Sequence, residues 1–381
     1  MVGEPLAVGQ RDRRELPVRR GVQLDRQPPP VGIEVVAHGA LSRLRARVSR
    51  RRRGANRRPS RDRRHHSPTC AFRLNAHLRV SSGARRLSRV NTPFTEEPAW
   101  EVVVVGAGPA GLTAATYLAR FRRRVLVLDG GPSRAEWIPE SHNTPGFPHG
   151  VGGPDLVARM RAQAVAFGAV VRPGRVDSLE AATDGLRLDG TFGTMEVPAA
   201  LLATGVVDHL PPIPGVEAAI RDSRVRMCPI CDAFEAIDRR IAVLTDGDLG
   251  EREAAFLRTY SADVEVLRIG EAEGCPGMQI ALEDLRLEAQ GVVLRRGGQP
   301  ERRFDHLYLA LGCAAQSDLA VAAGARQDEL NNLIVDAHQM TSVDGLYAAG
   351  DVVRGLNQIA VGVGEAAIAA TAIHNRLRGA G

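Results

Sequence analysis

Residues 101–129 of the 381-residue chain read EVVVVGAGPAGLTAATYLARFRRRVLVLD. The first five form a short, β-branched apolar run, which predicts a buried strand. A glycine-rich turn follows, then small and apolar residues over 112–120 that predict a helix, and then a second apolar run over 124–128. The segment therefore predicts one strand–turn–helix–strand unit that ends in the carboxylate of Asp129.

The turn of this unit has the spacing GxGxxG, which in this setting is typical of a dinucleotide-binding site. Gly106 permits the tight turn, Gly108 lets the backbone approach a pyrophosphate, and Gly111 lets the helix pack closely on the strand. The N-terminus of the helix then faces the phosphates. Asp129 lies 23 residues after Gly106, where an acid accepts a hydrogen bond from a ribose hydroxyl.

Two shorter motifs lie further along the chain, each at the end of a predicted apolar strand. The first is ATG at residues 203–205, and the second is GLYAAGD at residues 345–351. Small residues over 358–372 then predict a helix. In this order the motifs resemble the FAD-binding domain of the two-dinucleotide flavoprotein disulfide reductases.

That resemblance implies FAD as cofactor, with Asp351 bonded to the ribityl chain and the turn at Gln358 facing the flavin ring. The segment NTPGFP, residues 143–148, resembles the family's Asn-x-Pro-Gly segment, whose asparagine contacts the flavin. The expected cofactor contacts are Gly106, Gly108, Pro109, Ala110, Gly111, Asp129, Asn143, Ala203, Thr204, Gly205, Gly350, Asp351, Gln358 and Ile359.

Among five cysteines, only Cys228 and Cys231 have a chemically informative spacing, CPIC. Two intervening residues allow a disulfide that opens and closes locally, with one sulfur activated as a thiolate. Half of a zinc site or an inert pair are the alternatives, but zinc would need further ligands and no metal site is expected. Cys313, after a predicted strand, is expected to be a buried small hydrophobe.

Asp232 directly follows the pair, and CPICD resembles the CxxCD motif of the low-molecular-weight thioredoxin reductases. The resemblance implies that Cys231 is the thiol nearer the flavin, that Cys228 exchanges with the substrate, and that Asp232 carries the proton. It also implies a thioredoxin-like protein or a small dithiol or disulfide as partner, a homodimer and a cytoplasmic location.

The second nucleotide-binding motif departs from that family. A predicted strand over 240–244 leads into TDGDLG at 245–250, where GxGxxA or GxGxxG is expected, and Asp246 and Asp248 place negative charge beside a pyrophosphate. The candidate NAD(P)H contacts are Gly247, Gly250 and Arg268. Two interpretations stay open: the site binds NAD(P)H weakly or in altered form, or pyridine nucleotide binding is lost.

Three functions are consistent with these patterns. The first is an FAD-dependent NAD(P)H oxidoreductase resembling thioredoxin reductase. The second is a flavin-dependent dithiol oxidase that passes electrons to oxygen without NAD(P)H. The third is a non-catalytic flavoprotein with a nucleic-acid-binding arm.

The first 95 residues differ in composition from the rest of the chain. They hold 23 arginines and six acidic residues, whereas the remainder is acidic. We interpret this segment as upstream sequence translated in error, a solvated extension, or a nucleic-acid or targeting arm. Since it lacks interleaved aromatic residues, and since the rest is acidic, the charge does not indicate a nucleic-acid partner for the enzyme.

The sequence predicts an α/β fold with no transmembrane helix, since no apolar run of about 18 residues occurs. A disordered, Arg-rich extension over 1–98 precedes a discontinuous, three-layer FAD-binding domain, residues 99–212 and 312–381. A second Rossmann-like domain of NAD(P) type, carrying the cysteine pair, is inserted at 213–311.

Overall fold

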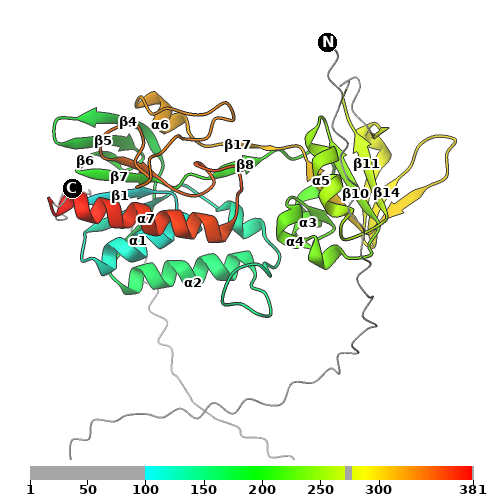
Figure 1. Cartoon of the computed structure of the whole chain (residues 1–381), viewed down its shortest axis with the longest axis horizontal. Coiled ribbons are helices and arrows are strands. Elements are labelled where there is room, and N and C mark those ends of the chain that lie inside the picture. The colour runs from blue at the N-terminus through cyan, green and yellow to red at the C-terminus, as the bar shows by residue number, and fades with distance from the viewer. Residues whose placement is uncertain (1–98, 271–276, 380–381) are drawn as a thin grey trace, which may run out of the picture. The chain divides into compact units, whose positions relative to one another are not determined.

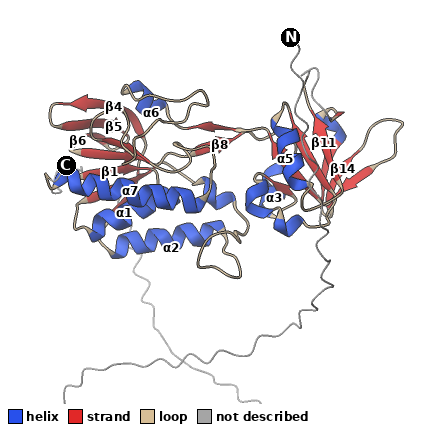
Figure 2. Ribbon diagram, in the orientation of Figure 1, coloured by secondary structure: helices blue, strands red, loops and turns tan. Residues whose placement is uncertain are grey.

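The computed structural model describes residues 99–270 and 277–379, and these form the predicted α/β fold with parallel sheets (Figures 1 and 2). The extension predicted to be disordered, 1–98, lies outside the described residues. Cys275 also lies outside them.

The first sheet has five parallel strands in the order β18-β7-β1-β2-β3. The central strand is the valine run with which the nucleotide-binding motif begins, and all four of its side chains are buried. The bounds are β1 Val102–Val105, β2 Val125–Asp129, β3 Val170–Pro173, β7 Ala199–Leu202 and β18 Leu346–Ala348.

Both faces of this sheet are covered, because successive side chains of a strand point to opposite sides. Val102 and Val104 belong to a core shared with helices α1, α2 and α7, whereas Val103 and Val105 face a second core under a three-stranded sheet (Figure 1). The covering elements are α1 Pro109–Arg120, α2 Gly153–Ala166, α7 Ile359–Leu377, β4 Val176–Ala182, β5 Gly185–Gly190, β6 Gly193–Val197 and α6 Asp318–Ala322.

Helices α1 and α7 are longer than the sequence predicted. α1 begins at Pro109, since proline suits the first turn of a helix, where its missing N–H has no partner to lose. α7 continues to Leu377 because Ile373 is fully buried in the core with α1. Within the described residues, no helix is long and apolar enough to cross a membrane.

The segment between the two halves of this domain builds a second parallel sheet, in the order β12-β11-β10-β16-β9. Helix α5 packs on one face of this sheet. Helix α3 and a three-stranded antiparallel sheet pack on the opposite face. The bounds are α3 Val216–Arg221, β9 Val225–Arg226, α4 Pro229–Asp232, β10 Ile241–Thr245, α5 Leu249–Leu257, β11 Val264–Arg268, β12 Met278–Gln279, β13 Leu285–Glu288, β14 Gly291–Leu294, β15 Arg302–Phe304 and β16 His306–Ala310.

A two-stranded antiparallel ribbon joins the inserted segment to the first domain. β8 (Val206–Asp208) leaves the first domain and β17 (Cys313–Ala315) returns to it, with Cys313 paired to Asp208. Cys313 is half-buried in this ribbon, so its expected place as a buried hydrophobe is wrong. The domain boundaries at 212 and 312 stay a prediction, four residues after β8 and one before β17.

Substitution of Gly111 by Ala is expected to destabilise the first domain strongly. A Cβ there would lie 2.0 Å from the carbonyl oxygen of Gly106, so strand and helix would have to separate. Overpacking and strain of this kind cost about 2 kcal/mol or more, which should lower the thermal midpoint by at least about 5 °C. The matched control is Gly364→Ala in α7, where nothing lies within 4 Å and alanine favours the helix. Equal midpoints for the two variants in a thermal melt would contradict the prediction.

Candidate active site

A cavity of about 810 Å³ opens at the carboxyl ends of the strands of the first sheet. This is the edge at which open α/β sheets bind their ligands, and the volume is within the range of cofactor sites. The cavity extends from the glycine-rich turn after β1 to the cysteine pair of the inserted segment. One space therefore connects the predicted nucleotide site with the predicted redox site.

Most of the predicted site residues lie along this cavity although they come from distant parts of the chain. Those that line it are Gly106, Gly108, Pro109, Ala110, Asn143, Ala203, Thr204, Gly205, Cys228, Cys231, Asp232, Gly350, Asp351, Gln358 and Ile359. The predicted residues outside its lining are Gly111, Asp129, Gly247, Gly250 and Arg268. Of the last three, Gly247 lies in the turn between β10 and α5, Gly250 lies in α5, and Arg268 ends β11.

The turn after β1 fits the pyrophosphate of FAD. Gly106 has φ +107°, and a Cβ there would lie 2.3 Å from the carbonyl oxygen of Ala203, so only glycine fits. Gly108, the residue before α1, lines the cavity without a side chain, and no side chain caps the helix there. The N-terminus of α1 is thus open to an anion.

Asp129 ends β2 as predicted, but its carboxylate already has protein partners. It forms an ion pair with Arg161 of α2 and accepts a hydrogen bond of 3.2 Å from the amide of Gly131. These contacts fix the carboxylate at the strand end. A ribose hydroxyl would therefore join an existing network there.

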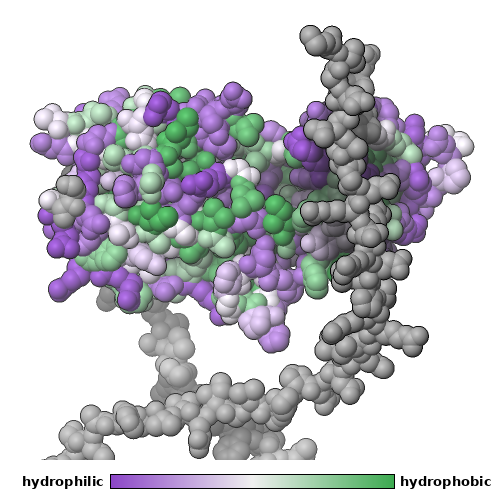
Figure 3. Space-filling view, in the orientation of Figure 1, coloured by the Kyte–Doolittle hydropathy of each residue, from purple (hydrophilic) through white to green (hydrophobic). Residues whose placement is uncertain are grey.

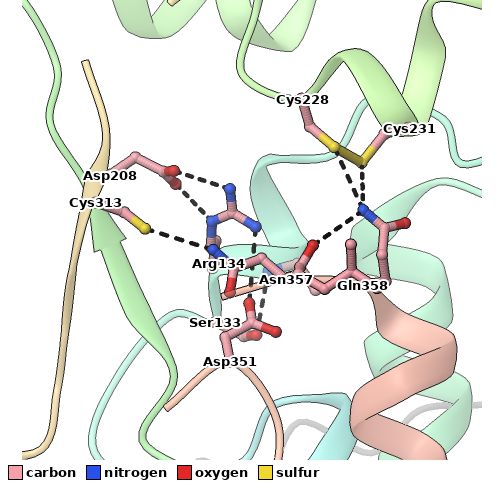
Figure 4. A network of polar contacts seen from close by, with 11 residues as sticks. Ser133, Arg134, Asp208, Cys228, Cys231, Cys313, Asp351, Asn357 and Gln358 are labelled. Carbon is pink, nitrogen blue, oxygen red and sulfur yellow. Dashed lines mark hydrogen bonds and ion pairs between the residues drawn. A yellow bond between two sulfur atoms is a disulfide. The ribbon is translucent and has the colours of Figure 1, made fainter. Parts of the chain in front are cut away.

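Arg134 is a functional candidate that the sequence did not single out (Figure 4). Its guanidinium binds Asp208 of β8 through two hydrogen bonds of 2.6 and 2.8 Å, and its Nη1 lies 3.7 Å from Asp351 Oδ2. Burial raises the pKa of Asp351 above its ordinary value, and the charge of Arg134 opposes that shift. Arg134 thus links the interdomain ribbon to the residue expected to hold the ribityl chain.

Glu365 of α7 holds the loop that presents Asp351. Its buried carboxylate accepts a 2.9 Å hydrogen bond from the amide of Gly350 and pairs with Arg354. Gly350 has φ +86°, which suits a residue without a side chain. No sequence pattern indicated a role for Glu365, because its local context is a predicted helix of small residues.

Cys228 and Cys231 are joined in a disulfide at the start of α4. The amide of Cys231 donates to the carbonyl oxygen of Cys228 at 3.0 Å, which closes the turn between them. Because the two sulfurs are bonded to each other, neither is a free thiolate in this structure.

Gln358 connects the disulfide to the cofactor cavity. Its Nε2 lies 3.5 Å from Cys228 Sγ and 3.4 Å from Cys231 Sγ (Figure 4). Its Oε1 accepts a 3.0 Å hydrogen bond from Asn143 Nδ2, and Asn143 Oδ1 accepts one from Ser141. Asn143, Gln358 and both cysteines, which the sequence placed 215 residues apart at most, therefore form one polar chain.

Asp232 is held by two donors from the inserted sheet. Tyr308 of β16 donates to its Oδ1 at 2.8 Å, and Arg226 of β9 lies 3.3 Å from its Oδ2. Burial raises the pKa of Asp232 to about 6, against the opposing effects of Arg226 and Tyr308, while the charge of Glu235 adds to the rise. A carboxyl with this pKa can give and take a proton near neutral pH.

Arg134, Arg226 and Tyr308 are not among the site residues that the sequence predicts. For Arg134 there is a local sequence pattern, because SRAE at 133–136 forms a capping box. This capping box starts a short 3-10 helix, Arg134–Trp137. Arg226 precedes Cys228 by two residues, but only the fold turns it toward Asp232. Tyr308 lies 76 residues after Asp232, and no local pattern distinguishes it from other core residues of its strand.

Comparison with known proteins agrees with this geometry. The family model described as "Pyridine nucleotide-disulphide oxidoreductase" matches residues 100–303 and 278–366. Thioredoxin reductase of Streptomyces clavuligerus is 30% identical over 275 residues, which are 66% of this chain and 85% of that protein. The chain is also 29% identical to NADPH-dependent thioredoxin reductase 3 of Arabidopsis thaliana, with 72% of this chain and 57% of that longer protein covered.

A solved structure shares the fold. Thioredoxin reductase from Streptococcus pyogenes MGAS5005 superimposes with a TM-score of 0.65 at 24% identity, covering 74% of this chain and all but 1% of that one. At this identity the likeness concerns the fold alone.

Replacement of Arg134 by Gln is expected to weaken FAD binding. Loss of the guanidinium leaves the partly buried carboxylates of Asp208 and Asp351 without their cation, and removal of one partner of such a pair costs about 3 kcal/mol. We expect the FAD dissociation constant, measured by flavin fluorescence, to rise at least about tenfold. Arg159→Gln is the matched control, because Arg159 pairs with Asp155 on the exposed surface of α2. Equal FAD affinity in both variants would refute a role for Arg134.

Proposed function

The chain belongs to the pyridine nucleotide-disulphide oxidoreductase family and is similar to its thioredoxin reductases, and on this premise we propose that Cys228 and Cys231 carry electrons between bound FAD and an external disulfide. FAD, when bound, supplies the two-electron redox chemistry. The protein contributes the cavity, the position of the sulfurs and the control of one proton.

One observation carries the proposal: the disulfide lies against Gln358, at the end of the cavity lined by the FAD motifs. Gln358 precedes the first turn of α7, the turn that the family resemblance places at the flavin ring. The amide of Gln358 therefore holds the pair at the redox end of the cavity and links it to Asn143.

The exchange requires two steps at sulfur once the pair is a dithiol. The Cys228 thiolate attacks one sulfur of the external disulfide, the substrate S–S bond breaks, and the leaving thiolate takes a proton. The Cys231 thiolate then attacks Cys228 Sγ, which re-forms the Cys228–Cys231 bond and releases the second substrate thiolate, which is protonated. The substrate gains two electrons and two protons, and the pair loses two electrons.

Asp232 is the proton donor for the leaving thiolate in this scheme. It lines the same cavity and directly follows Cys231, and its pKa of about 6 lets it hold a proton at mildly acidic pH and release it as the pH approaches neutral. Arg226 and Tyr308 fix the carboxyl in place.

The relatives favour the reductase direction over the dithiol oxidase, since those reported above are named thioredoxin reductases. We accordingly propose NADPH or NADH as the electron donor and a thioredoxin-like protein, or a small disulfide, as the acceptor. The resemblance also supports a cytoplasmic homodimer. Figure 3 shows apolar surface on the face that α7 crosses, and Ile368 of this helix is 45% exposed, so such a dimer would have an apolar surface to cover.

Anaerobic titration tests the proposed function directly. NADPH or NADH should bleach the flavin absorbance, and the reduced protein should then reduce a thioredoxin-like disulfide. Cys228→Ser and Cys231→Ser should lose disulfide turnover by at least about a thousandfold, because no thiolate or no resolving thiol remains. Cys275→Ser, outside the pair, is the matched control. Full turnover in Cys228→Ser, or no bleaching by either nucleotide, would reject the proposal.

The pH dependence of exchange tests the role of Asp232. The donor is the protonated carboxyl, so the protonation-dependent rate should fall as pH rises through about 6. Tyr308→Phe removes a hydrogen bond that lowers the pKa, so the inflection should move upward by about half a unit to one unit. Tyr347→Phe is the matched control, because Tyr347 is buried in the other sheet. An inflection that is the same in both variants would exclude Tyr308 from positioning Asp232.

A further inference from the structure

The chain contains two turns that occupy the same position in a strand–turn–helix unit. In the first, β1 leads through Gly106 and Gly108 into α1, and in the second, β10 leads through Thr245 and Gly247 into α5. Both units place a glycine five residues after the start of the turn, at Gly111 and Gly250. The two turns are therefore comparable residue by residue, and the decisive difference is Thr245 in the place of Gly106.

Thr245 fills the second turn with its own side chain. The residue is 1% exposed, and a Cβ on Gly250 would lie 2.4 Å from both Cβ and Cγ2 of Thr245. The threonine side chain thus lies between the turn and the first residues of α5. Gly250 has to be a glycine because this threonine occupies the space beside it.

The hydroxyl of Thr245 also binds the backbone groups of the turn. Its Oγ1 accepts hydrogen bonds of 3.2 Å from the amides of Gly247 and Gly250, and it donates one of 2.9 Å to the carbonyl oxygen of Gly247. A hydroxyl has one donor and two acceptor positions, so all of its bonds are used. These amides are the kind of donor that a pyrophosphate uses at such a turn.

As it stands, the second turn therefore does not fit a dinucleotide as the first one does. In the first turn, no side chain caps the N-terminus of α1, and Gly108 lines the large cavity. In the second turn, two amides are already bonded, and the exposed carboxylates of Asp246 and Asp248 add negative charge where a pyrophosphate would approach.

We propose that Thr245 is the residue that limits the affinity of this chain for pyridine nucleotides, because its hydroxyl occupies the backbone donors of the second dinucleotide turn. The inference rests on the proposed function only in taking NADPH or NADH as the ligand of the inserted sheet. For the nucleotide to bind, the amides of Gly247 and Gly250 have to break their hydrogen bonds to Thr245 Oγ1 and donate to a phosphate oxygen instead. The chain then binds the nucleotide more weakly than the same turn with glycine would.

Calorimetric titration of the FAD-loaded full chain with NADP⁺ and NAD⁺ tests this inference. Thr245→Gly should bind at least one of them about tenfold more tightly than the unchanged protein, since two competing hydrogen bonds are removed. Thr245→Ser is the matched control, because serine keeps the hydroxyl and should leave the dissociation constant within about twofold.

Flavin absorbance and a thermal melt establish that each variant is folded. If Thr245→Gly does not fold, Thr245→Ala removes the same hydroxyl and should also tighten binding. Equal dissociation constants for the hydroxyl-free variants and Thr245→Ser would overturn the inference. A protein that shows no turnover would instead reject the proposed function, because calorimetry measures binding without turnover.

Discussion

The close approach of Gly106 to the carbonyl of Ala203 is the constraint on which the cofactor cavity depends. It brings the turn after β1 against the end of β7, and Gly111 then packs on the Gly106 carbonyl so that α1 begins directly at the cavity. Any side chain at these positions would separate strand from helix and displace the helix N-terminus. The valines of β1 hold this arrangement in place by filling cores on both faces of the sheet.

The redox site is built on that frame by polar contacts between distant segments. Asn143 and Gln358 extend from the cavity to the disulfide, while Arg134 ties the interdomain ribbon at Asp208 to the loop of Asp351. At Asp232, burial likewise raises the pKa of the carboxyl, although the adjacent Arg226 opposes the rise. Charges near the cavity are thus paired across elements, which couples the position of the inserted segment to the cofactor site.

The two dinucleotide turns show how one fold position can be used in opposite ways. Glycine at position 106 has no side chain to bind the amides of its turn, so these amides and the N-terminus of α1 are left to a ligand. In the second turn, the hydroxyl of Thr245 accepts hydrogen bonds from the amides of Gly247 and Gly250. The structure of the second unit is preserved because the hydroxyl replaces the anion in the hydrogen-bond network. Retention of the fold is therefore compatible with the lower nucleotide affinity that we propose for the second turn.

The sequence alone determined the strand–turn–helix units, the FAD motifs, the redox spacing of Cys228 and Cys231, and the anomaly at Thr245, because each is a local pattern of residue types. It did not reveal Arg134, Arg226, Tyr308 or Glu365, whose partners are brought near only by the fold. It also predicted Cys313 to be a buried hydrophobe, although this residue is only half-buried in the ribbon of β8 and β17. Short spacings in the sequence show which chemical groups lie close together along the chain. The pairing of charges, and the hydrogen bonds that the amides of a turn form, depend instead on distances that only tertiary packing sets.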